Sequence, residues 1–346
     1  MRVLVTGNLG YIGTVLTDRL ARQGLTVQGL DVGYFANCVV GAPPNDPPTY
    51  RMDIRDITAQ ELAGVDAVIH LAGLSNDPLG EFDPGLTARI NLEATCRLID
   101  LAKAAGVRRF VYASSQSMYG VADTSTELDE YDSDKAPVTA YARTKWEAEG
   151  YLSAQASASF TPVSFRPSTV FGWSPRQRLD IVFPNLVATA LTQGAVKVQS
   201  DGTPWRPVVH IADVCLAFEV GLTAPPSLIS GRAFNVGYEH GNFTVRDLAE
   251  AAAEAVPGST VDFSKTPTLD NRTYRVSFRR IFEELDGLYS PSWDLASGAK
   301  QMVSEWSQSG LNSSDITGPR CVRLNRLKEL LAAGRLDDDL RLREAV

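Results

Sequence analysis

The sequence contains little cysteine and histidine, with four cysteines and three histidines among 346 residues. The cysteines form no C-x-x-C pair and the histidines are equally scattered, so neither type has the spacing of a zinc site or a disulfide framework. We therefore expect no bound metal and four reduced thiols, as is typical of a cytoplasmic protein.

The sequence also lacks long apolar runs and an excess of basic residues. No run approaches the roughly 20 apolar residues that a membrane helix requires. Arg2–Val5 already has the pattern of a buried strand, so we expect no signal or transit peptide. Asp and Glu number 41 against 33 Lys and Arg, a net charge of −8 that argues against a nucleic-acid or anionic-membrane surface. A local basic pocket remains compatible with this acidic total.

What remains is an ordinary globular composition. Hydrophobic residues make up 44% and charged residues 21%, which excludes wholesale disorder. The length suggests about two domains, large enough to fold without a disulfide or metal.

Short apolar runs alternate with helical patterns along the first 115 residues. Strands are expected at Arg2–Val5, Val27–Leu30, Ala67–Leu71 and Phe110–Ala113, and helices at Tyr11–Gln23 and Ile90–Ala105. Later strands are expected at Val163–Arg166 and Ala233–Val236, and later helices at Ala140–Ala156, Val208–Ala224, Val245–Val256 after Thr244 as N-cap, and around Leu324–Leu331. This alternation predicts an α/β fold with a Rossmann-type, doubly wound parallel sheet.

A glycine-rich turn follows the first expected strand. Gly7, Gly10 and Gly13 have G-x-x-G-x-x-G spacing and open a helix, whose N-terminus favours phosphate. Asp31 ends the next strand, where a carboxylate accepts hydrogen bonds from ribose hydroxyls and repels a 2′-phosphate. The sequence therefore predicts NAD rather than NADP. Asp53 is placed either to face the adenine or simply to make a turn.

A reactive pair is expected on the helix that begins near residue 140. Tyr141 and Lys145 lie one helical turn apart, and the ammonium should lower the phenol pKa so that Tyr141 can act as a base. A serine-rich loop, Ser114–Ser117, follows the strand Phe110–Ala113 at the sheet edge where ligands bind. A chance Y-x-x-x-K and a plain serine loop are the competing interpretations of each feature alone.

Together these motifs resemble the extended short-chain dehydrogenase/reductases, within the NAD-dependent epimerase/dehydratase family acting on nucleotide sugars. The resemblance covers about residues 1–310 and rests on Thr6–Gly13, Asp31, Asp53–Asp56, His70–Gly73, Ser114–Gly120, Tyr141–Lys145, Arg166–Gly172, Arg206–Asp213 and Phe234–Gly237. It implies an NAD-binding domain of residues 1–172, to which 205–236 return, a smaller C-terminal α/β substrate domain of 173–204 and 237–310, and a helical extension of 311–346.

The resemblance also implies roles for individual residues. Tyr141 would be the base, Ser115 its hydrogen-bonding partner, and Lys145 the partner that also holds the nicotinamide ribose. NAD would be lined by Gly7, Asn8, Leu9, Gly10, Tyr11, Ile12, Gly13, Asp31, Asp53, Ile54, Leu71, Ala72, Gly73 and Lys145. The nucleotide sugar would meet Ser117, Thr169, Asn185, Arg206 and Arg272, with Arg176, Arg178 and Arg275 as nearby candidates for a basic pocket.

Departures from the family pattern narrow the expected chemistry. Sugar 4,6-dehydratases carry an Asp-Glu pair directly after the catalytic Thr, whereas this chain has Gln116 and Ser117, and only a distant acid such as Glu127 could substitute. The loop has no Cys, which the members that invert C3 and C5 use. Thr169 stands where many relatives have Asn near the substrate, which suggests an unusual sugar or a different sugar placement.

The resulting hypothesis is a nucleotide-sugar 4-epimerase that works through a 4-keto intermediate. A 4-ketoreductase or oxidase and a 4,6-dehydratase are the alternatives on the same template. A non-catalytic NAD-binding module is disfavoured because Tyr141 and Lys145 are intact. A homodimer through helices near 90–105 and 141–156 is the family habit.

Overall fold

The computed structural model describes residues 1–263 and 273–343. Its central element is a seven-stranded sheet with the order β10-β6-β5-β4-β1-β2-β3, in which all neighbouring strands are parallel. The strands are β1 (Arg2–Thr6), β2 (Thr26–Leu30), β3 (Thr49–Tyr50), β4 (Ala67–His70), β5 (Arg109–Ala113), β6 (Thr161–Pro167) and β10 (Arg232–Val236). This confirms the predicted doubly wound Rossmann-type fold.

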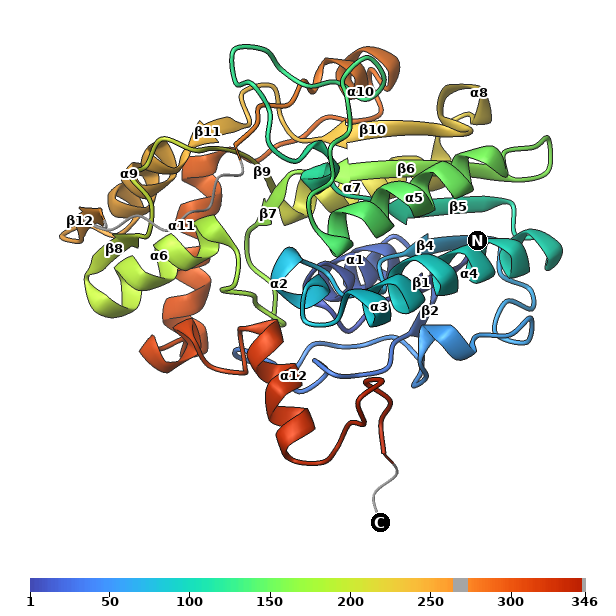
Figure 1. Ribbon diagram of the computed structural model, residues 1–346, viewed down its shortest axis with the longest axis horizontal. Helices are drawn as coiled ribbons and strands as arrows, with labels where there is room; N and C mark the ends of the chain where they lie inside the picture. The colour runs from blue at the N-terminus through green and yellow to red at the C-terminus, as the bar shows by residue number, and fades with distance from the viewer. Residues whose placement is uncertain (264–272, 344–346) are drawn as a thin grey trace.

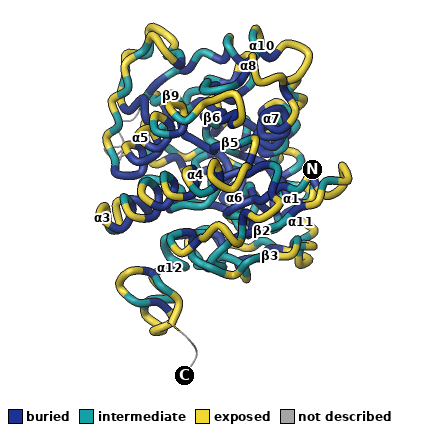
Figure 2. Tube along the Cα trace, turned by 90° about the vertical axis from the view of Figure 1, so that its right-hand side faces the viewer, coloured by how far each residue is buried: buried dark blue, intermediate teal, exposed yellow. Residues whose placement is uncertain are grey.

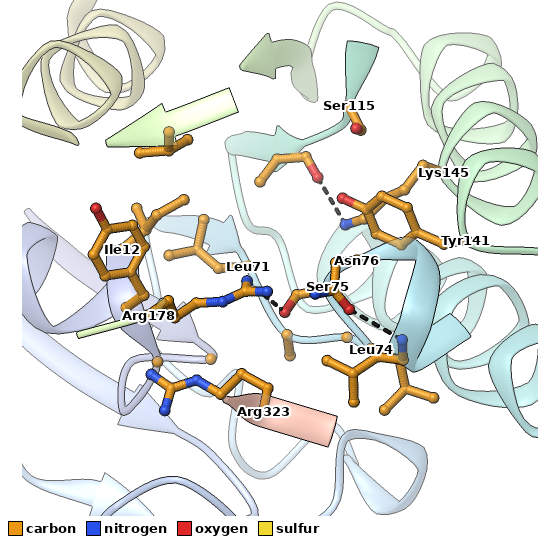
Figure 3. Close-up of a pocket in the computed structure, with 18 of the residues that line it drawn as sticks. Ile12, Leu71, Leu74, Ser75, Asn76, Ser115, Tyr141, Lys145, Arg178 and Arg323 are labelled. Carbon is orange, nitrogen blue, oxygen red and sulfur yellow. Dashed lines mark hydrogen bonds between the residues drawn. The ribbon is translucent and has the colours of Figure 1, made fainter. Parts of the chain in front are cut away.

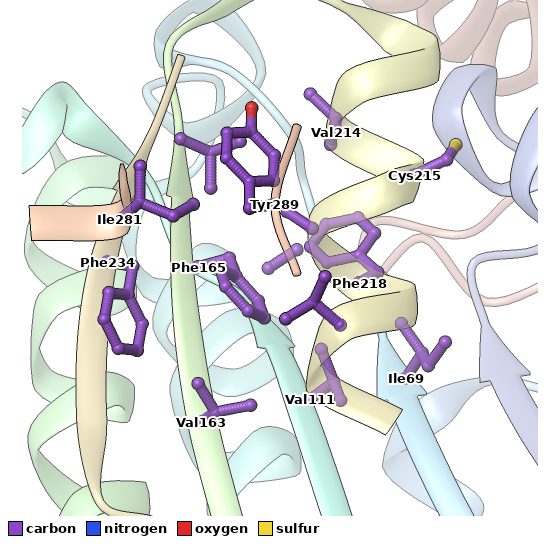
Figure 4. Packing of buried hydrophobic residues seen from close by; sticks show 14 of the residues in the cluster. Ile69, Val111, Val163, Phe165, Val214, Cys215, Phe218, Phe234, Ile281 and Tyr289 are labelled. Atoms are coloured by element: carbon purple, nitrogen blue, oxygen red, sulfur yellow. The ribbon is translucent and has the colours of Figure 1, made fainter. Parts of the chain in front are cut away.

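Helices cover both faces of the sheet (Figure 1). α1 (Tyr11–Arg22) and α7 (Ile211–Thr223) pack on one face, and α4 (Ala94–Ala104) and α5 (Ala140–Ala154) on the other. Side chains alternate along β1, so that Val3 and Val5 pack in the core on the side of α1 and α7, while Leu4 packs in the core on the side of α4 and α5. Figure 4 shows Phe218 of α7 packed over the sheet residues Phe165 and Val111. Burial on both faces explains why these strands are continuous apolar runs.

Short elements connect the larger ones. They are η1 (Ile54–Asp56), α2 (Asp77–Gly80), α3 (Pro84–Thr87), the π-helical turn η2 (Ala88–Glu93) that leads into α4, η3 (Gln116–Tyr119) and α8 (Pro226–Ile229). α4 and α5, the helices of the predicted dimer face, contact each other, and Trp146 on α5 is 41% exposed. The homodimer stays a prediction.

A second group of elements lies beyond the carboxyl ends of the central strands. It contains the sheet β11 (Asn242–Thr244), β9 (Trp205–His210) and β7 (Thr169–Phe171), the pair β8 (Ala195–Val198) and β12 (Thr260–Phe263), and the helices α6 (Val182–Gln193), α9 (Val245–Ala255) and α11 (Leu295–Ser309). α10 (Arg279–Glu284) packs instead against β10 of the central sheet. The capping residue Thr244 accepts from the backbone N–H of Asp247, as predicted. Phe183 of α6 and Trp306 of α11 are fully buried in this third core.

The predicted helix Val208–Ala224 begins too early. Val208–His210 end β9 and pair with Thr169–Phe171 of β7. The helix starts at Ile211, where the His210 side chain accepts from the N–H of Ala212 at 3.3 Å and caps it. Two consecutive buried valines are compatible with a strand and with the buried face of a helix. The apolar pattern alone therefore did not distinguish the strand from the helix.

The C-terminal segment returns to the first half of the chain. After η4 (Ser313–Ile316) it forms α12 (Arg323–Ala332), and Leu327 is buried in the same core as α4 and α5. Figures 1 and 2 show α12 and the loop that follows it at the bottom of the molecule, beyond β2. Across 1–263 and 273–343, no helix is both long and apolar enough to cross a bilayer.

Candidate active site

A cavity of about 510 Å³ lies at the carboxyl ends of β1, β4 and β5 (Figure 3). β2 and β4 flank β1, so the chain order reverses there, which is the usual ligand-binding point of an open α/β sheet. The walls come from the glycine loop, from the loops after β4 and β5, from the region after β7, and from α12. The sheet topology therefore brings the separate sequence motifs to one place.

The glycine loop is shaped by its own backbone. Gly7 has a φ of 75°, and a Cβ there would lie 2.8 Å from the Ala72 nitrogen. A Cβ on Gly13 would lie 2.2 Å from the Gly7 oxygen. α1 follows Gly10 with no capping bond from any described side chain, so its first N–H groups lack a side-chain acceptor, and its first turn lines the cavity. This arrangement fits a phosphate group.

Two acidic groups flank the loop. Asp31 accepts hydrogen bonds from the N–H groups of Leu9 at 3.0 Å and Gly33 at 2.7 Å. Burial raises the pKa of Asp31, and these two bonds oppose the rise. Asp53 accepts a fork of hydrogen bonds from Arg55, which lowers its pKa although burial acts in the opposite direction. Asp31 retains acceptor capacity for ribose hydroxyls.

Most of the residues predicted to line NAD lie on the cavity, and two do not. Asn8 is fully buried and donates to Thr49 Oγ1 at 2.9 Å, and Leu9 is buried beside it. Both shape the loop through the backbone. The remaining members line the cavity: Gly7, Gly10, Tyr11, Ile12, Gly13, Asp31, Asp53, Ile54, Leu71, Ala72, Gly73 and Lys145.

Ser115, Tyr141 and Lys145 line one end of the cavity together (Figure 3). Thr139 caps α5 by accepting from the Ala142 N–H at 3.1 Å, and this start places Tyr141 and Lys145 on one helix face. Lys145 Nζ donates to the Ala113 carbonyl at 2.8 Å and lies 4.8 Å from the Tyr112 ring centroid. Burial without a carboxylate lowers the pKa of Lys145 to about 7.

The expected lowering of the tyrosine pKa by lysine is not found. Burial raises the pKa of Tyr141, a hydrogen bond with Ser115 opposes the rise, and Lys145 is not among the causes. The ammonium is instead engaged with the Ala113 carbonyl and the Tyr112 ring. The protein groups alone therefore hold the phenol in its protonated form at neutral pH.

Acidic groups are absent from the positions next to Ser115. Ser115 Oγ donates to Ser117 Oγ at 3.1 Å. The Gln116 amide is buried, donating to the Arg166 carbonyl at 3.0 Å and accepting from Ser168 Oγ at 3.1 Å. Glu127 cannot replace an acid here, because it does not line the cavity and is paired with Arg275 at 2.8 Å. That ion pair also removes Arg275 from the predicted basic pocket.

The predicted sugar-binding residues divide into three groups. Ser117, Thr169 and Arg206 line the cavity. Asn185 does not, since its side-chain amide donates to the Leu179 carbonyl at 3.0 Å within the loop before α6. Arg272 lies outside the described residues.

Among the described residues, three arginines line the cavity: Arg206 and Arg178, which were among the candidates for a basic pocket, and Arg323, which was not. Arg178 lines the cavity beside Ile12 of the glycine loop (Figure 3), where it pairs with Asp180 at 2.8 Å and donates to Ser75 at 3.1 Å. Arg176 lies behind the loop, paired with Asp46 at 2.6 Å. Arg323 of α12 lines the cavity from the C-terminal segment, which the resemblance did not cover. The sequence feature that could have indicated Arg323 is its position four residues before Leu327, on the apolar face of the helix.

Comparison with known proteins identifies the family of the chain. The profile of the NAD dependent epimerase/dehydratase family matches residues 3–237. The chain belongs to this family. The UDP-glucose 4-epimerase of Mycolicibacterium smegmatis is 30% identical over 315 residues, covering 88% of this chain and 97% of that protein. UDP-glucuronic acid decarboxylase 1 of Arabidopsis thaliana is 26% identical over 330 residues, covering 92% and 72%.

A solved structure has a similar fold. MoeE5 in complex with UDP-glucuronic acid and NAD is 27% identical with a TM-score of 0.76, covering 90% of this chain and all of that one. This epimerase/dehydratase family member therefore uses NAD. Its residues fit the cofactor, because the uncapped start of α1 suits a pyrophosphate, Gly7 and Gly13 leave no room for a Cβ, and Asp31 suits ribose hydroxyls.

Proposed function

We propose that the protein is a nucleotide-sugar 4-epimerase. The observation that carries this proposal is the composition of the reactive end of the cavity. Ser115, Tyr141 and Lys145 supply groups for oxidation and reduction at a hydroxyl, while the neighbouring Gln116 and Ser117 supply no acid for loss of water. A 4-epimerase relative with 30% identity over nearly its full length supports the same choice.

The residues suggest a division of labour. Bound NAD would supply a reversible hydride acceptor. Tyr141 would take the C4-hydroxyl proton, with Ser115 sharing the hydrogen bond. It would return the proton after the 4-keto sugar has rotated in the cavity. Burial raises the pKa of Tyr141 and lowers that of Lys145, so it disfavours the charged form of both groups. The charge of a bound ligand would change both pKa values.

The other walls would bind the remaining parts of the ligands. Lys145 would hold the nicotinamide ribose while its ammonium stays near the Ala113 carbonyl. Arg206, on β9, would hold the sugar diphosphate, as would Arg272. Holding the diphosphate is what permits the sugar to rotate without leaving the cavity.

A decarboxylase acting on a nucleotide-linked uronic acid is the second candidate. It shares the oxidation at C4, and a hydroxyl-rich end of the cavity favours it. Ser114, Ser115, Ser117 and Thr169 line that end, and Ser114 Oγ is buried without a hydrogen-bond partner among the described residues. Such hydroxyls can donate to a carboxylate. Two of the similar proteins support this candidate: UDP-glucuronic acid decarboxylase 1 and MoeE5, whose structure contains UDP-glucuronic acid.

The test is conversion of individual nucleotide sugars by the purified protein. UDP-, dTDP-, GDP-, CDP- and ADP-sugars, with UDP-glucuronic acid included, are followed by NMR, by absorbance of NADH and by CO₂ release. Epimerisation without net NADH supports the proposal. Loss of CO₂ selects the decarboxylase, loss of water a dehydratase, and steady NADH formation an oxidase.

Tyr141→Phe provides the residue-level test. Removing the phenol oxygen should reduce turnover by about 100- to 10,000-fold, the usual contribution of a positioned acid–base group. NAD content should be unchanged, because the ring and its packing are retained. Activity near that of the wild type would refute the role of Tyr141, and Tyr131→Phe, at an exposed tyrosine, is the matched control.

A further inference from the structure

The C-terminal segment contacts the cofactor side of the cavity at several points. Tyr34 donates to the Leu340 carbonyl, Arg55 donates to the Asp339 carbonyl at 2.9 Å, and Arg341 pairs with Asp56. Tyr34 itself lines the cavity. Asp339, Leu340 and Arg341 lie beyond the part of the chain that matches the family profile, which ends at 237.

Arg323 is the residue of this segment that reaches the cavity wall. It is 2% exposed. Its Nη2 donates to the Arg176 carbonyl at 2.7 Å, and its guanidinium carbon lies 4.7 Å from the Phe35 ring centroid. Its Nη1 is buried and has no hydrogen-bond partner among residues 1–263 and 273–343. A buried donor without a partner is costly, so a ligand atom is a natural partner.

The charge around Arg323 is also unbalanced. Asp180 is engaged by the Arg178 fork and by Asn76, and reaches only the backbone N–H of Arg323, at 3.4 Å. Within the described chain, no carboxylate forms an ion pair with the Arg323 guanidinium. Burial and the neighbouring Arg178 lower the pKa of Arg323 to about 10. An anionic ligand would offset both effects.

The neighbours of Arg323 place it along the expected path of the dinucleotide. Arg176, whose carbonyl it binds, extends its side chain to Thr14 Oγ1 at 2.9 Å in the first turns of α1. Phe35, on which it stacks, follows Asp31 by four residues. Arg323 is thus located between the helix start that suits a pyrophosphate and the acid that suits the ribose. Figure 3 shows it on the wall with Arg178 and Ile12, away from Tyr141.

We propose that Arg323 binds the pyrophosphate of NAD, and that the C-terminal segment thereby holds the cofactor in its site. The inference rests on NAD lying along the glycine loop, as proposed above. A guanidinium group suits this role because it remains charged and donates to two phosphate oxygens. The consequence is slow release of NAD, which suits an enzyme that regenerates its cofactor in every cycle.

The test compares Arg323→Met with Lys328→Gln, a charge-removing change at an exposed position of the same helix. NAD, ADP-ribose and adenosine binding to the full-length, NAD-depleted protein are measured by calorimetry, and NAD release by rapid mixing. Arg323→Met should bind NAD and ADP-ribose about 10- to 100-fold more weakly, as expected for one charge-assisted hydrogen-bonding group. Binding of adenosine, which has no phosphate, should be unchanged, and Lys328→Gln should resemble the wild type throughout.

A stability measurement separates this role from a purely structural one. Arg323→Met removes a buried, unbalanced charge and keeps the volume, but it also leaves the Arg176 carbonyl without its donor, so the Tm of the NAD-free protein should change little. Equal NAD affinity of Arg323→Met and wild type, or an equal loss for adenosine and ADP-ribose, overturns the inference. Failure of the wild type to bind NAD would instead overturn the cofactor site itself, so the two failures are distinguishable.

Discussion

Two kinds of hydrogen-bond donor line the cavity, and they differ in how they carry charge. The loop from Gly7 to Gly13 offers backbone N–H groups at the start of α1, which carry only partial charge. Arg178, Arg323 and Lys145, in contrast, bring cationic side chains into buried positions. The donors of the loop belong to the backbone itself, whereas the charge of each buried cation has to be compensated by neighbouring groups.

The difference shows in how each cation is compensated. Arg178 has a carboxylate partner in Asp180. Arg323 and Lys145 have carbonyl and ring partners only, and burial lowers the pKa of both. We infer that the side chains without a carboxylate are the ones that a ligand charge would stabilise most.

The largest effect is expected from a substitution in the glycine loop. In Gly13→Ala the new Cβ would lie 2.2 Å from the Gly7 oxygen and 2.6 Å from the Asn8 Cα, and neither atom can move without distorting the loop. We expect a loss of about 4 kcal/mol or more in the free energy of unfolding, together with loss of NAD binding. Denaturant titration and calorimetry measure the two effects.

Gly150→Ala is the matched control for that substitution. Gly150 is an exposed position within α5, and a Cβ there would meet no atom within 4 Å. Alanine should stabilise the helix by about 0.5–1 kcal/mol. If Gly13→Ala is as well tolerated as this control, the close packing of the loop is not what specifies glycine.

Arg178→Met tests the compensated cation. It leaves Asp180 buried without its guanidinium partner, which should destabilise the protein by about 3–5 kcal/mol at neutral pH. The pKa of Asp180 lies below its ordinary value, because Arg178 outweighs the opposing effect of burial. Its stabilising contribution is therefore present above pH 4 and is lost as the pH falls, so the difference between variant and wild type should shrink on acidification.

Two further variants check this interpretation. Arg22→Met, in an exposed pair with Asp18, should change stability by less than about 1 kcal/mol. Adding Asp180→Asn to Arg178→Met should recover part of the loss, because the buried charge is removed. A single variant as stable as Arg22→Met would contradict a structural role for the Arg178–Asp180 pair.

The same contrast explains which residues the sequence predicted. Gly7, Gly10, Gly13 and Asp31 depend on a strand, a turn and a helix that are adjacent in the chain, so spacing identified them. Tyr141 and Lys145 are likewise related by one helical turn. Local patterns of this kind follow from backbone geometry and need no knowledge of tertiary packing.

The residues whose positions spacing did not predict depend on contacts outside their own helix or strand. Arg323 reaches Arg176 across 147 positions, and Glu127 is withdrawn from the site by Arg275, 148 positions away. Asn185 has the expected type and register, yet Leu179, six residues before it, takes its amide. Which of several arginines or acids reaches a cavity is decided by packing, and the apolar pattern records only that a face is buried.

The smallest effect is expected for Lys145, and it depends on pH. Burial lowers the pKa of Lys145 from 10.5 to about 7. In the unfolded chain the lysine binds its proton up to about pH 10.5, so wild-type stability rises with pH between 7 and 10.5, and the cost of burying the charge is complete below pH 7. Lys145→Met, which removes that cost, should stabilise the NAD-free protein more at pH 6 than at pH 9, by about 2–3 kcal/mol. Unfolding at the two pH values measures this difference, and Lys328→Met, at an exposed lysine, should show none. A difference of the opposite sign would mean that a nearby anion compensates Lys145, and the contrast between Lys145 and Arg178 would then disappear.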